Sequence, residues 1–475
     1  MKANTTGNLA YRSTLPALIA ATGLALGASF PTFAADLTPE QQRFHDIYKQ
    51  LIEINTSHSA GDNTVAARAM AQRLQEAGFS ASDMEVFEPF PKKGNLVMRW
   101  KGSGAKKPIL LLAHIDVVEA KRADWKTDPF QLQETGGYFT ARGAIDDKAM
   151  ASSFVSILGQ LKREGFKPDR DIILALTADE ERGDEGTNGA SWLVNHKRDL
   201  IQAAFGINEG GGGELKDGVP KINRIQVAEK VYETYEFEVT NPGGHSSVPR
   251  EENAIYQLAD ALERLQQYKF PVKMAEVTKA YFAKSAPFFS GQQSTDMLAV
   301  AKDNPDPDAI ARLSKTPTYN ALFRTTCVAT MLEGGHAENA LPQRATATVN
   351  CRILPHDDIA GVEQQLKTLA GDKVKVRALL PPTPSPPSPL SDEIMGPAEK
   401  ITSQMWPGVP VIPSMSTGAS DSRFLRNVGI PMYGISGMFV EPSDARSHGL
   451  DERILIKQLY EGREFLYRLV KALAS

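Results

Sequence analysis

The sequence contains only two cysteines, Cys327 and Cys351, in 475 residues. This scarcity excludes a small fold held together by several disulfides. The two cysteines lie almost symmetrically about a predicted hairpin, so a single bridge in an oxidising compartment and two unpaired core thiols both fit the pattern. A catalytic thiol is not expected.

A long basic tract is also absent. The chain has 53 lysines and arginines against 57 aspartates and glutamates, and its net charge is −4. Nucleic acid and anionic membranes are recognised through clusters of basic residues, so neither is an expected partner. With 41% hydrophobic and 23% charged residues, the composition is typical of a soluble globular protein. The length favours two domains.

One apolar stretch stands near the N-terminus, where "LPALIAATGLALGASF" follows Lys2 and Arg12. At about 16 residues it is short for a membrane anchor, which needs roughly 20. A basic start, an apolar centre and small residues before Ala34 are typical of a cleaved signal peptide. We therefore expect residues 1–34 to be removed, and the mature chain to be periplasmic or secreted, without stable membrane insertion.

The first half of the mature chain alternates apolar runs with helical patterns. Three of these runs are "PILLLAH" (108–114), "DIILALTA" (171–178) and "AAFGINEG" (203–210). Continuous apolar runs indicate strands buried on both faces, and intervening helices make the sheet largely parallel. We therefore predict an α/β catalytic domain whose first part covers residues 35–228.

The pattern changes near residue 229, where "VYETYEFEVT" alternates polar and apolar side chains as a half-exposed antiparallel strand does. The following elements have the order βαββαβ, which is typical of a small ferredoxin-like α+β domain. An irregular stretch with scattered prolines is expected at 270–320. We predict an inserted lid and dimerisation domain at 229–382, and a return to the catalytic domain at 383–475 with a last helix at 451–473.

Histidines and carboxylates follow the ends of successive predicted strands. Taken singly, such a histidine is usually just the polar residue at which a strand ends, and an aspartate before a helix is usually an N-cap. Together they meet at one edge, because ligands of open α/β sheets bind beyond the carboxyl ends of the strands. Histidine and carboxylate ligands suit zinc or a related divalent ion. The residues concerned are His114, Asp116, Asp146, Asp179, Glu180, Glu181 and Glu209.

These residues belong to a series of motifs that occurs in a known order. The motifs are His114-x-Asp116, Gly143-x-x-Asp146-x-Lys148, Asp179-Glu180-Glu181-x-Gly183, Glu209, Gly243-Gly244-His245-Ser246 and His448-Gly449-x-x-Glu452. The series resembles the co-catalytic zinc amidohydrolase and exopeptidase family. That family includes glutamate carboxypeptidase, succinyl-diaminopimelate desuccinylase, acetylornithine deacetylase, aminoacylase and carnosinase.

The resemblance implies two divalent metal ions per chain, with zinc as the first expectation and cobalt or manganese as alternatives. Asp146 would bridge the two ions. His114 and Glu209 would complete one site, and Glu181 and His448 the other. Two such cations offset the repulsion among the carboxylates and lower the pKa of a bridging water.

The resemblance also assigns catalytic roles. Glu180 would be the general base that deprotonates the attacking water, and Asp116 would hold the imidazole of His114. His245 would stabilise the oxyanion from the lid of a partner subunit in a homodimer. Asp179 is expected to be structural. Residues matching substrate-contacting positions of relatives are Asn339, Arg352 and Gly418.

The expected activity is hydrolysis of an amide bond in small peptides or N-acyl amino acids by an exported di-zinc enzyme. Among relatives, a glutamate at position 209 favours carboxypeptidases and acyl-amino-acid hydrolases over dipeptidases. A dipeptidase is the alternative within the family, and a non-catalytic protein that binds metal or peptide is the alternative outside it. A binding protein needs no base at Glu180, so this residue favours an enzyme. Ala149 departs from the glycine usual in the family, without an expected loss of chemistry.

Overall fold

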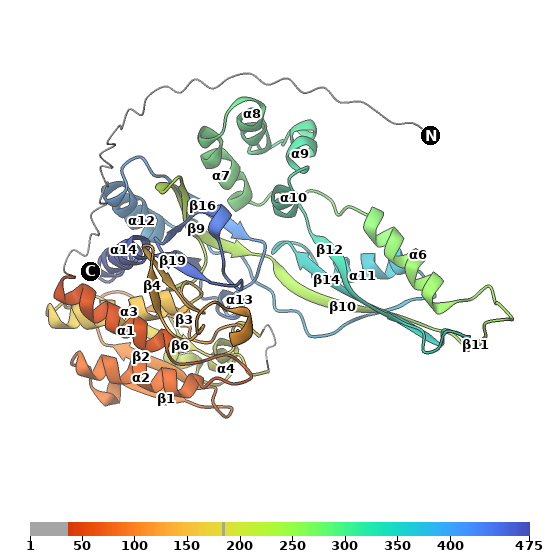
Figure 1. The fold of residues 1–475 in the computed structure, drawn as a ribbon. Coiled ribbons are helices and arrows are strands. Elements are labelled where there is room, and N and C mark those ends of the chain that lie inside the picture. The colour runs from red at the N-terminus through yellow and green to blue at the C-terminus, as the bar shows by residue number, and fades with distance from the viewer. Residues whose placement is uncertain (1–36, 183–185) are drawn as a thin grey trace, which may run out of the picture. The chain divides into compact units, whose positions relative to one another are not determined.

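The computed structural model describes residues 37–182 and 186–475 (Figure 1). The predicted signal segment, residues 1–34, lies outside the described residues, and so does Gly183 of the carboxylate motif. Within the described part of the chain, every helix is too short or too polar to span a bilayer.

A ten-stranded mixed sheet forms the centre of the larger domain (Figure 1). Strand β3 lies between β6 and β7 and runs parallel to both, and β17 runs parallel to β7. This arrangement confirms the predicted α/β class with a largely parallel centre. The strands are β1 (Met84–Phe87), β2 (Asn95–Trp100), β3 (Ile109–His114), β6 (Ile172–Thr177), β7 (Phe205–Asn208), β8 (Gly212–Lys216), β9 (Val219–Glu229), β16 (Val411–Ser416), β17 (Met432–Gly434) and β18 (Phe439–Val440).

Helices cover both faces of this sheet, which explains the continuous apolar runs. Successive side chains of a strand point to opposite faces. Ile109 and Leu111 of β3 join a core that includes residues of α1, α2, α3 and α14, whereas Leu110 and Leu112 join a second core with residues of α4 and α13. These helices are α1 (Pro39–Ile52), α2 (Asn63–Glu76), α3 (Lys148–Arg163), α4 (Gly189–His196), α13 (Ser422–Asn427) and α14 (Ile456–Leu473).

The second domain is a four-stranded antiparallel sheet with two helices and a core of its own. The strand order is β12-β14-β10-β15. A disulfide joins Cys327 of β12 to Cys351 of β14, which are directly paired in the ladder. Of the two possibilities left open by the sequence, the structure therefore has the bridge. The elements are β10 (Val231–Thr240), α6 (Ala254–Gln267), β12 (Thr326–Gly334), β14 (Arg344–Ile353), α11 (Ile359–Ala370) and β15 (Lys375–Ala378).

The segment 270–320 is not irregular, so that prediction is wrong. It contains four short helices, and their apolar residues, such as Phe282 and Leu313, pack into the main core of the first domain. Pro307 and Pro317 stand at the first positions of two of them, where the missing N–H costs no hydrogen bond. The helices are α7 (Glu276–Ser285), α8 (Gly291–Val300), α9 (Pro307–Leu313) and α10 (Pro317–Phe323).

The last helix begins at Ile456 rather than at residue 451, because residues 453–455 pair with β5 as a strand. This pairing ties the C-terminal part of the chain to the loop that precedes α3. The remaining elements are β4 (Gln133–Thr135), β5 (Tyr138–Thr140), α5 (Arg198–Ile201), β11 (Gly244–His245), β13 (Ala340–Leu341), α12 (Asp392–Met405) and β19 (Arg453–Leu455).

Candidate metal centre

Parallel strands deliver the predicted ligands to one edge of the sheet. His114 is the last residue of β3, and Glu209 follows β7 directly. Glu180 and Glu181 come shortly after β6, and Asp146 lies just before α3. Because β3, β6 and β7 are mutually parallel, their carboxyl ends meet at the same edge, where open α/β sheets bind ligands.

Asp146 lies between two histidines. Its Oδ1 is 3.2 Å from Nε2 of His114, and its Oδ2 is 3.2 Å from Nε2 of His448. The same nitrogen of His114 is 3.9 Å from Oε2 of Glu209, and that of His448 is 2.8 Å from Oε2 of Glu181. The five side chains therefore form two histidine–glutamate pairs that share one aspartate.

Opposite charges lower the repulsion within this cluster. Hydrogen bonds to Asp146 and Glu181 raise the pKa of His448 to about 10. Burial alone would raise the pKa of Asp146, but hydrogen bonds to His114 and His448 hold it well below its ordinary value. Burial raises the pKa of Glu209, and the charge of Asp146 raises it further although His114 opposes this. The carboxylates thus need positive charge beside them.

The donor atoms of the cluster fit divalent metal ions. Donor atoms of His114, Asp146 and Glu181 all lie within 4.8 Å of one another, and so do those of His114, Glu180 and Glu209. Glu181 Oε1 is buried and accepts no hydrogen bond from any described residue. Imidazole nitrogens with carboxylate oxygens suit zinc and related first-row ions.

Asp116 fixes the backbone of the carboxylate loop. Its two carboxylate oxygens accept hydrogen bonds from the backbone N–H groups of Glu180 and Glu181, both at 3.1 Å. Its carboxylate also lies 3.5 Å from Nδ1 of His114, while its backbone oxygen lies 3.1 Å from the same nitrogen. Burial raises the pKa of Glu180 well above its ordinary value, and the neighbouring Glu209 raises it further. A glutamate with this environment takes up a proton more readily than an exposed glutamate.

Asp179 turns the chain between β6 and the two glutamates. Its φ of 58° lies in the left-handed region, which is uncommon for residues other than glycine. Its buried carboxylate binds Lys93 at 2.6 Å and accepts a hydrogen bond from Thr187 at 2.6 Å. These contacts give Asp179 a structural setting. Lys93 could not be predicted from a local motif, because 86 residues separate it from Asp179.

Glu452 joins the loops that carry Asp146 and His448. Its carboxylate accepts hydrogen bonds from the backbone N–H groups of Gly143, Ile145 and Asp146 at 2.9–3.0 Å. It also binds Arg142 at 2.8 Å, and Arg142 in turn donates to the backbone oxygen of Gly449 at 2.9 Å. Sequence reasoning placed Glu452 in the histidine motif but missed this role, and it missed Arg142 altogether.

The remaining predicted residues make their described contacts outside this cluster. His245 is exposed, and its ring accepts hydrogen bonds from Ser247; its strand β11 pairs with β13, next to Asn339. Arg352 lies at the other end of β14, with its guanidinium 4.4 Å from the ring centre of Tyr232. From Arg344, where β14 begins, to Arg352 there are eight residues, which at about 3.4 Å per residue span roughly 27 Å along the strand. Gly418 lies just after β16, and its N–H donates to Ser416.

Comparison with known proteins identifies the family. The sequence profile of peptidase family M20/M25/M40 matches residues 110–472. The chain belongs to this family. A probable carboxypeptidase S-like 2 of Dictyostelium discoideum is 32% identical over 88% of each chain. The N-fatty-acyl-amino acid synthase/hydrolase PM20D1 of Homo sapiens is 31% identical over 77% of this chain and 74% of its own.

Solved structures of the family have the same fold. An M20 family metallo-carboxypeptidase from Sulfolobus solfataricus superposes with a TM-score of 0.69 at 17% identity, over 91% of this chain and 99% of that one. A dinuclear metal binding peptidase from Bacillus subtilis gives 0.59 at 12% identity, over 91% and 98%. The predicted family is confirmed, and the chain is a metal-dependent peptidase or amidohydrolase of a dinuclear family.

Proposed function

We propose that the chain is a two-metal hydrolase of the carboxypeptidase or N-acyl-amino-acid hydrolase type. Its substrates are small peptides or N-acyl amino acids, and zinc is the first candidate metal, with cobalt or manganese as alternatives. The observation that carries the proposal is Asp146, which offers one carboxylate oxygen to each of two histidine–glutamate pairs. Two relatives support the substrate class: one is named a probable carboxypeptidase S-like 2 and the other an N-fatty-acyl-amino acid synthase/hydrolase.

In this proposal the five clustered side chains hold the two ions. Asp146 would be shared, His114 and Glu209 would complete one site, and Glu181 and His448 would complete the other. When bound, divalent cations of this kind polarise the carbonyl of the scissile amide and lower the pKa of a water molecule. Glu452 and Arg142 keep the two ligand loops in register, and such outer partners commonly set metal affinity.

Glu180 acts as the general base and then as the general acid. Its carboxylate takes a proton from the attacking water, and the carbonyl carbon of the amide becomes tetrahedral. The same carboxyl group then returns the proton to the nitrogen of the leaving amine, so that the C–N bond breaks and a free amine departs. Asp116 supports this by holding the backbone of Glu180 in place.

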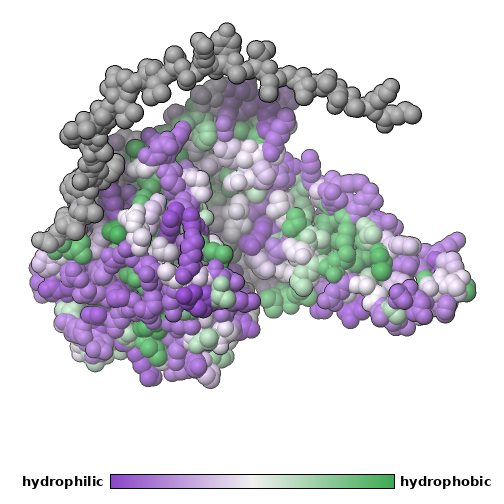
Figure 2. All heavy atoms as spheres, viewed as in Figure 1, coloured by the Kyte–Doolittle hydropathy of each residue, from purple (hydrophilic) through white to green (hydrophobic). Residues whose placement is uncertain are grey.

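His245 is proposed to stabilise the oxyanion from the lid of a second subunit. In support, His245 follows the last residue of the long strand β10. It therefore lies at the opposite end of this sheet from Tyr232, which stands near the start of the same strand. The edge strand β12 exposes Val328, Met331 and Leu332, and edge strands with apolar side chains favour pairing with another chain. Figure 2 shows apolar residues gathered on this domain. Asn339, Arg352 and Gly418 remain proposed substrate contacts.

The proposed location is a periplasm or the extracellular space, after removal of residues 1–34. The supporting observations are the basic, apolar and small-residue pattern of that segment and the disulfide between Cys327 and Cys351. Disulfides persist mainly in oxidising compartments. Sequencing the N-terminus of the exported product tests this proposal, and an intact residue 1 on the mature protein contradicts it.

The activity is tested on residues 35–475, stripped of metal and titrated with zinc, cobalt or manganese. Release of amine is followed from dipeptides, C-terminally blocked peptides and N-acyl amino acids. We expect metal to restore cleavage only where the leaving amino acid has a free carboxylate. Glu180→Gln is expected to bind two metal ions and to lose hydrolysis. Full turnover by Glu180→Gln, with contaminating enzyme excluded, contradicts the assignment of the base, and cleavage of free dipeptides alone favours a dipeptidase.

A further inference from the structure

Three consecutive residues between the end of β16 and the start of α13, Ser420, Asp421 and Ser422, are all buried. Each of them forms a side-chain hydrogen bond with a different part of the chain. Buried polar side chains are nearly always paired, so this run of three fixes the loop against each of its partners. The partners lie beside the candidate general base, beside a candidate metal ligand, and at the junction between the two domains.

Asp421 holds the chain on both sides of the two clustered glutamates. Its Oδ2 accepts a hydrogen bond from the hydroxyl of Thr177 at 3.0 Å, and its Oδ1 accepts one from the side-chain amide of Asn188 at 2.7 Å. Thr177 is the last residue of β6 and stands shortly before Glu180, and Asn188 caps the following helix α4. The position of the proposed base is therefore set in part by a carboxylate from much later in the chain.

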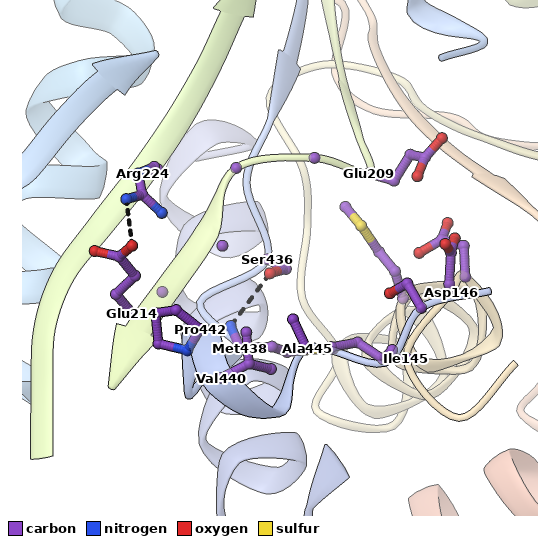
Figure 3. Close-up of a pocket in the computed structure, with 17 residues that line it drawn as sticks. Ile145, Asp146, Glu209, Glu214, Arg224, Ser436, Met438, Val440, Pro442 and Ala445 are labelled. Atoms are coloured by element: carbon purple, nitrogen blue, oxygen red, sulfur yellow. Dashed lines mark hydrogen bonds and ion pairs between the residues drawn. The ribbon is translucent and has the colours of Figure 1, made fainter. Parts of the chain in front are cut away.

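Ser422 binds the residue that precedes a candidate metal ligand. Glu209 lies with Asp146 at one end of a pocket of about 440 Å³, so it faces a space that a substrate can enter (Figure 3). Successive side chains of a strand point to opposite faces, and Asn208, the last residue of β7, is buried. Its amide donates a hydrogen bond to the hydroxyl of Ser422 at 3.0 Å. Ser422 thus braces β7 at the residue next to Glu209.

Ser420 binds a carboxylate at the junction of the two domains. Glu229 is fully buried and ends β9, just before β10 opens the second domain. Its Oε2 accepts a hydrogen bond from the hydroxyl of Ser420 at 2.8 Å. Its Oε1 accepts one from Ser385 at 3.0 Å and lies 3.0 Å from Nη1 of Arg426. Ser385 belongs to the stretch between β15 and α12, on which the chain returns to the first domain. Glu229 therefore binds a second connection between the domains as well as the loop of Ser420.

We infer that Glu229 is a positioning residue for the proposed reaction. Through Ser420 it fixes the loop whose next two residues brace the chain at Glu180 and Glu209, and so it links the domain junction to the catalytic centre. The inference rests on the proposed function, because that function gives Glu180 and Glu209 their roles. The bonds of a buried polar network support one another, and a misplacement of about 1 Å at the reacting groups can lower a rate by about 10²-fold. The link acts in both directions, so metal binding also steadies the junction.

Two serines provide a matched pair of variants. Glu229 itself is a poor target, because removing its charge would leave the buried Arg426 without a counter-ion and destabilise the protein. Ser420→Ala and Ser385→Ala each remove one buried hydroxyl that donates to Glu229, and both leave the Glu229–Arg426 pair in place. Both variants should fold and lose similar stability in urea unfolding. They differ because only Ser420 belongs to the loop that reaches the catalytic centre.

Activity and absorption of the cobalt-loaded proteins test the positioning role. At saturating cobalt, Ser420→Ala should lower kcat by at least about tenfold, whereas Ser385→Ala should keep the wild-type kcat. The visible absorption of bound cobalt depends on the arrangement of its ligands, so the spectrum should change in Ser420→Ala alone. A loss of kcat and a spectral change that are equal in the two variants, or absent from both, overturn the inference.

Hydrogen exchange separates failure of this inference from failure of the proposed function, because it requires no turnover. Mass spectrometry follows exchange in a peptide spanning residues 225–235, which includes the end of β9 and the start of β10, in metal-free and zinc-loaded protein. We expect zinc to slow this exchange at least about fivefold in the wild type and in Ser385→Ala, but not in Ser420→Ala. That pattern supports the link even if no tested substrate is hydrolysed. Exchange that zinc does not slow, or slows equally in all three proteins, refutes the link, and hydrolysis by the wild type then leaves the proposed function standing.

Discussion

Replacing Glu452 by glutamine should damage the metal centre without removing a metal ligand. The carboxylate accepts four hydrogen bonds: three from the backbone of residues 143–146 and one from Arg142. A glutamine keeps one acceptor oxygen and presents an NH₂ group in place of the other, so two of the four donors lose their partner. Each unsatisfied buried donor costs about 1–3 kcal/mol, which gives a loss of about 2–6 kcal/mol in the free energy of unfolding.

Metal affinity should fall as well, because Asp146 is held through its own N–H by Glu452. Loss of such an outer partner typically weakens metal binding 10- to 100-fold. Chelator competition on metal-stripped protein measures the affinity, and urea unfolding measures the stability. Glu464→Gln is the control: Glu464 is a half-buried residue paired with the exposed Arg468 one helical turn away, and loss of this pair should cost less than about 0.5 kcal/mol. Wild-type affinity and stability in Glu452→Gln would refute the linking role.

Three further changes test other parts of the molecule. His245→Ala should fold normally and lower kcat by on the order of 10²–10³-fold, the usual loss for one oxyanion donor. If His245 acts across a dimer, mixing His245→Ala chains with Glu180→Gln chains should restore part of the activity, and no recovery argues against a role across the dimer. Burial, with the nearby Arg352, lowers the pKa of Lys230 to about 7. Above that pH the unfolded chain holds one proton more, so stability should rise with pH by about 1.4 kcal/mol per unit relative to Lys230→Met, and equal pH profiles in urea unfolding at pH 7.5 and 9.5 contradict this. Reducing the disulfide, whose cysteines are 24 residues apart, should cost about 3 kcal/mol of stability, and identical thermal unfolding with and without reductant would argue against that contribution.

That the candidate metal ligands lie together was predictable, because short sequence motifs indicate where each one stands. His114 and Glu209 each stand at the end of an apolar run, and parallel strands bring such ends together whatever the loops between them do. The supports of the cluster were not predictable in this way. Glu452 accepts a hydrogen bond from the N–H of Gly143, which lies 309 residues earlier in the chain. Every residue type except proline has a backbone N–H, so the residue types in a sequence do not show which of these groups will pair with a given carboxylate. Its place in the histidine motif was the only signal.

The fold, too, was predictable where local sequence patterns determine it and unpredictable where tertiary packing does. Alternation of polar and apolar side chains predicted β10 at Val231–Thr240 with its correct bounds. The helices α7–α10 were missed because each is short and because scattered prolines are typical of irregular structure. Pro307 and Pro317 instead stand at the first position of a helix, where proline is favoured. Which core these helices join depends on tertiary packing, so their sequence pattern could not reveal it.

The link between Arg142, Glu452 and the loop of His448 also bears on the order in which the protein is made. A ribosome releases the strands that carry His114, Glu180 and Glu209 long before it releases His448 and Glu452. Until then the carboxylates lack one histidine and the anchor of Asp146, and like charges at short range oppose their assembly. On the proposed ligand assignment, a product truncated before residue 446 lacks His448 and with it one of the two sites. We therefore expect metal uptake to follow completion of the chain, and prematurely terminated copies to remain metal-poor and open to proteolysis.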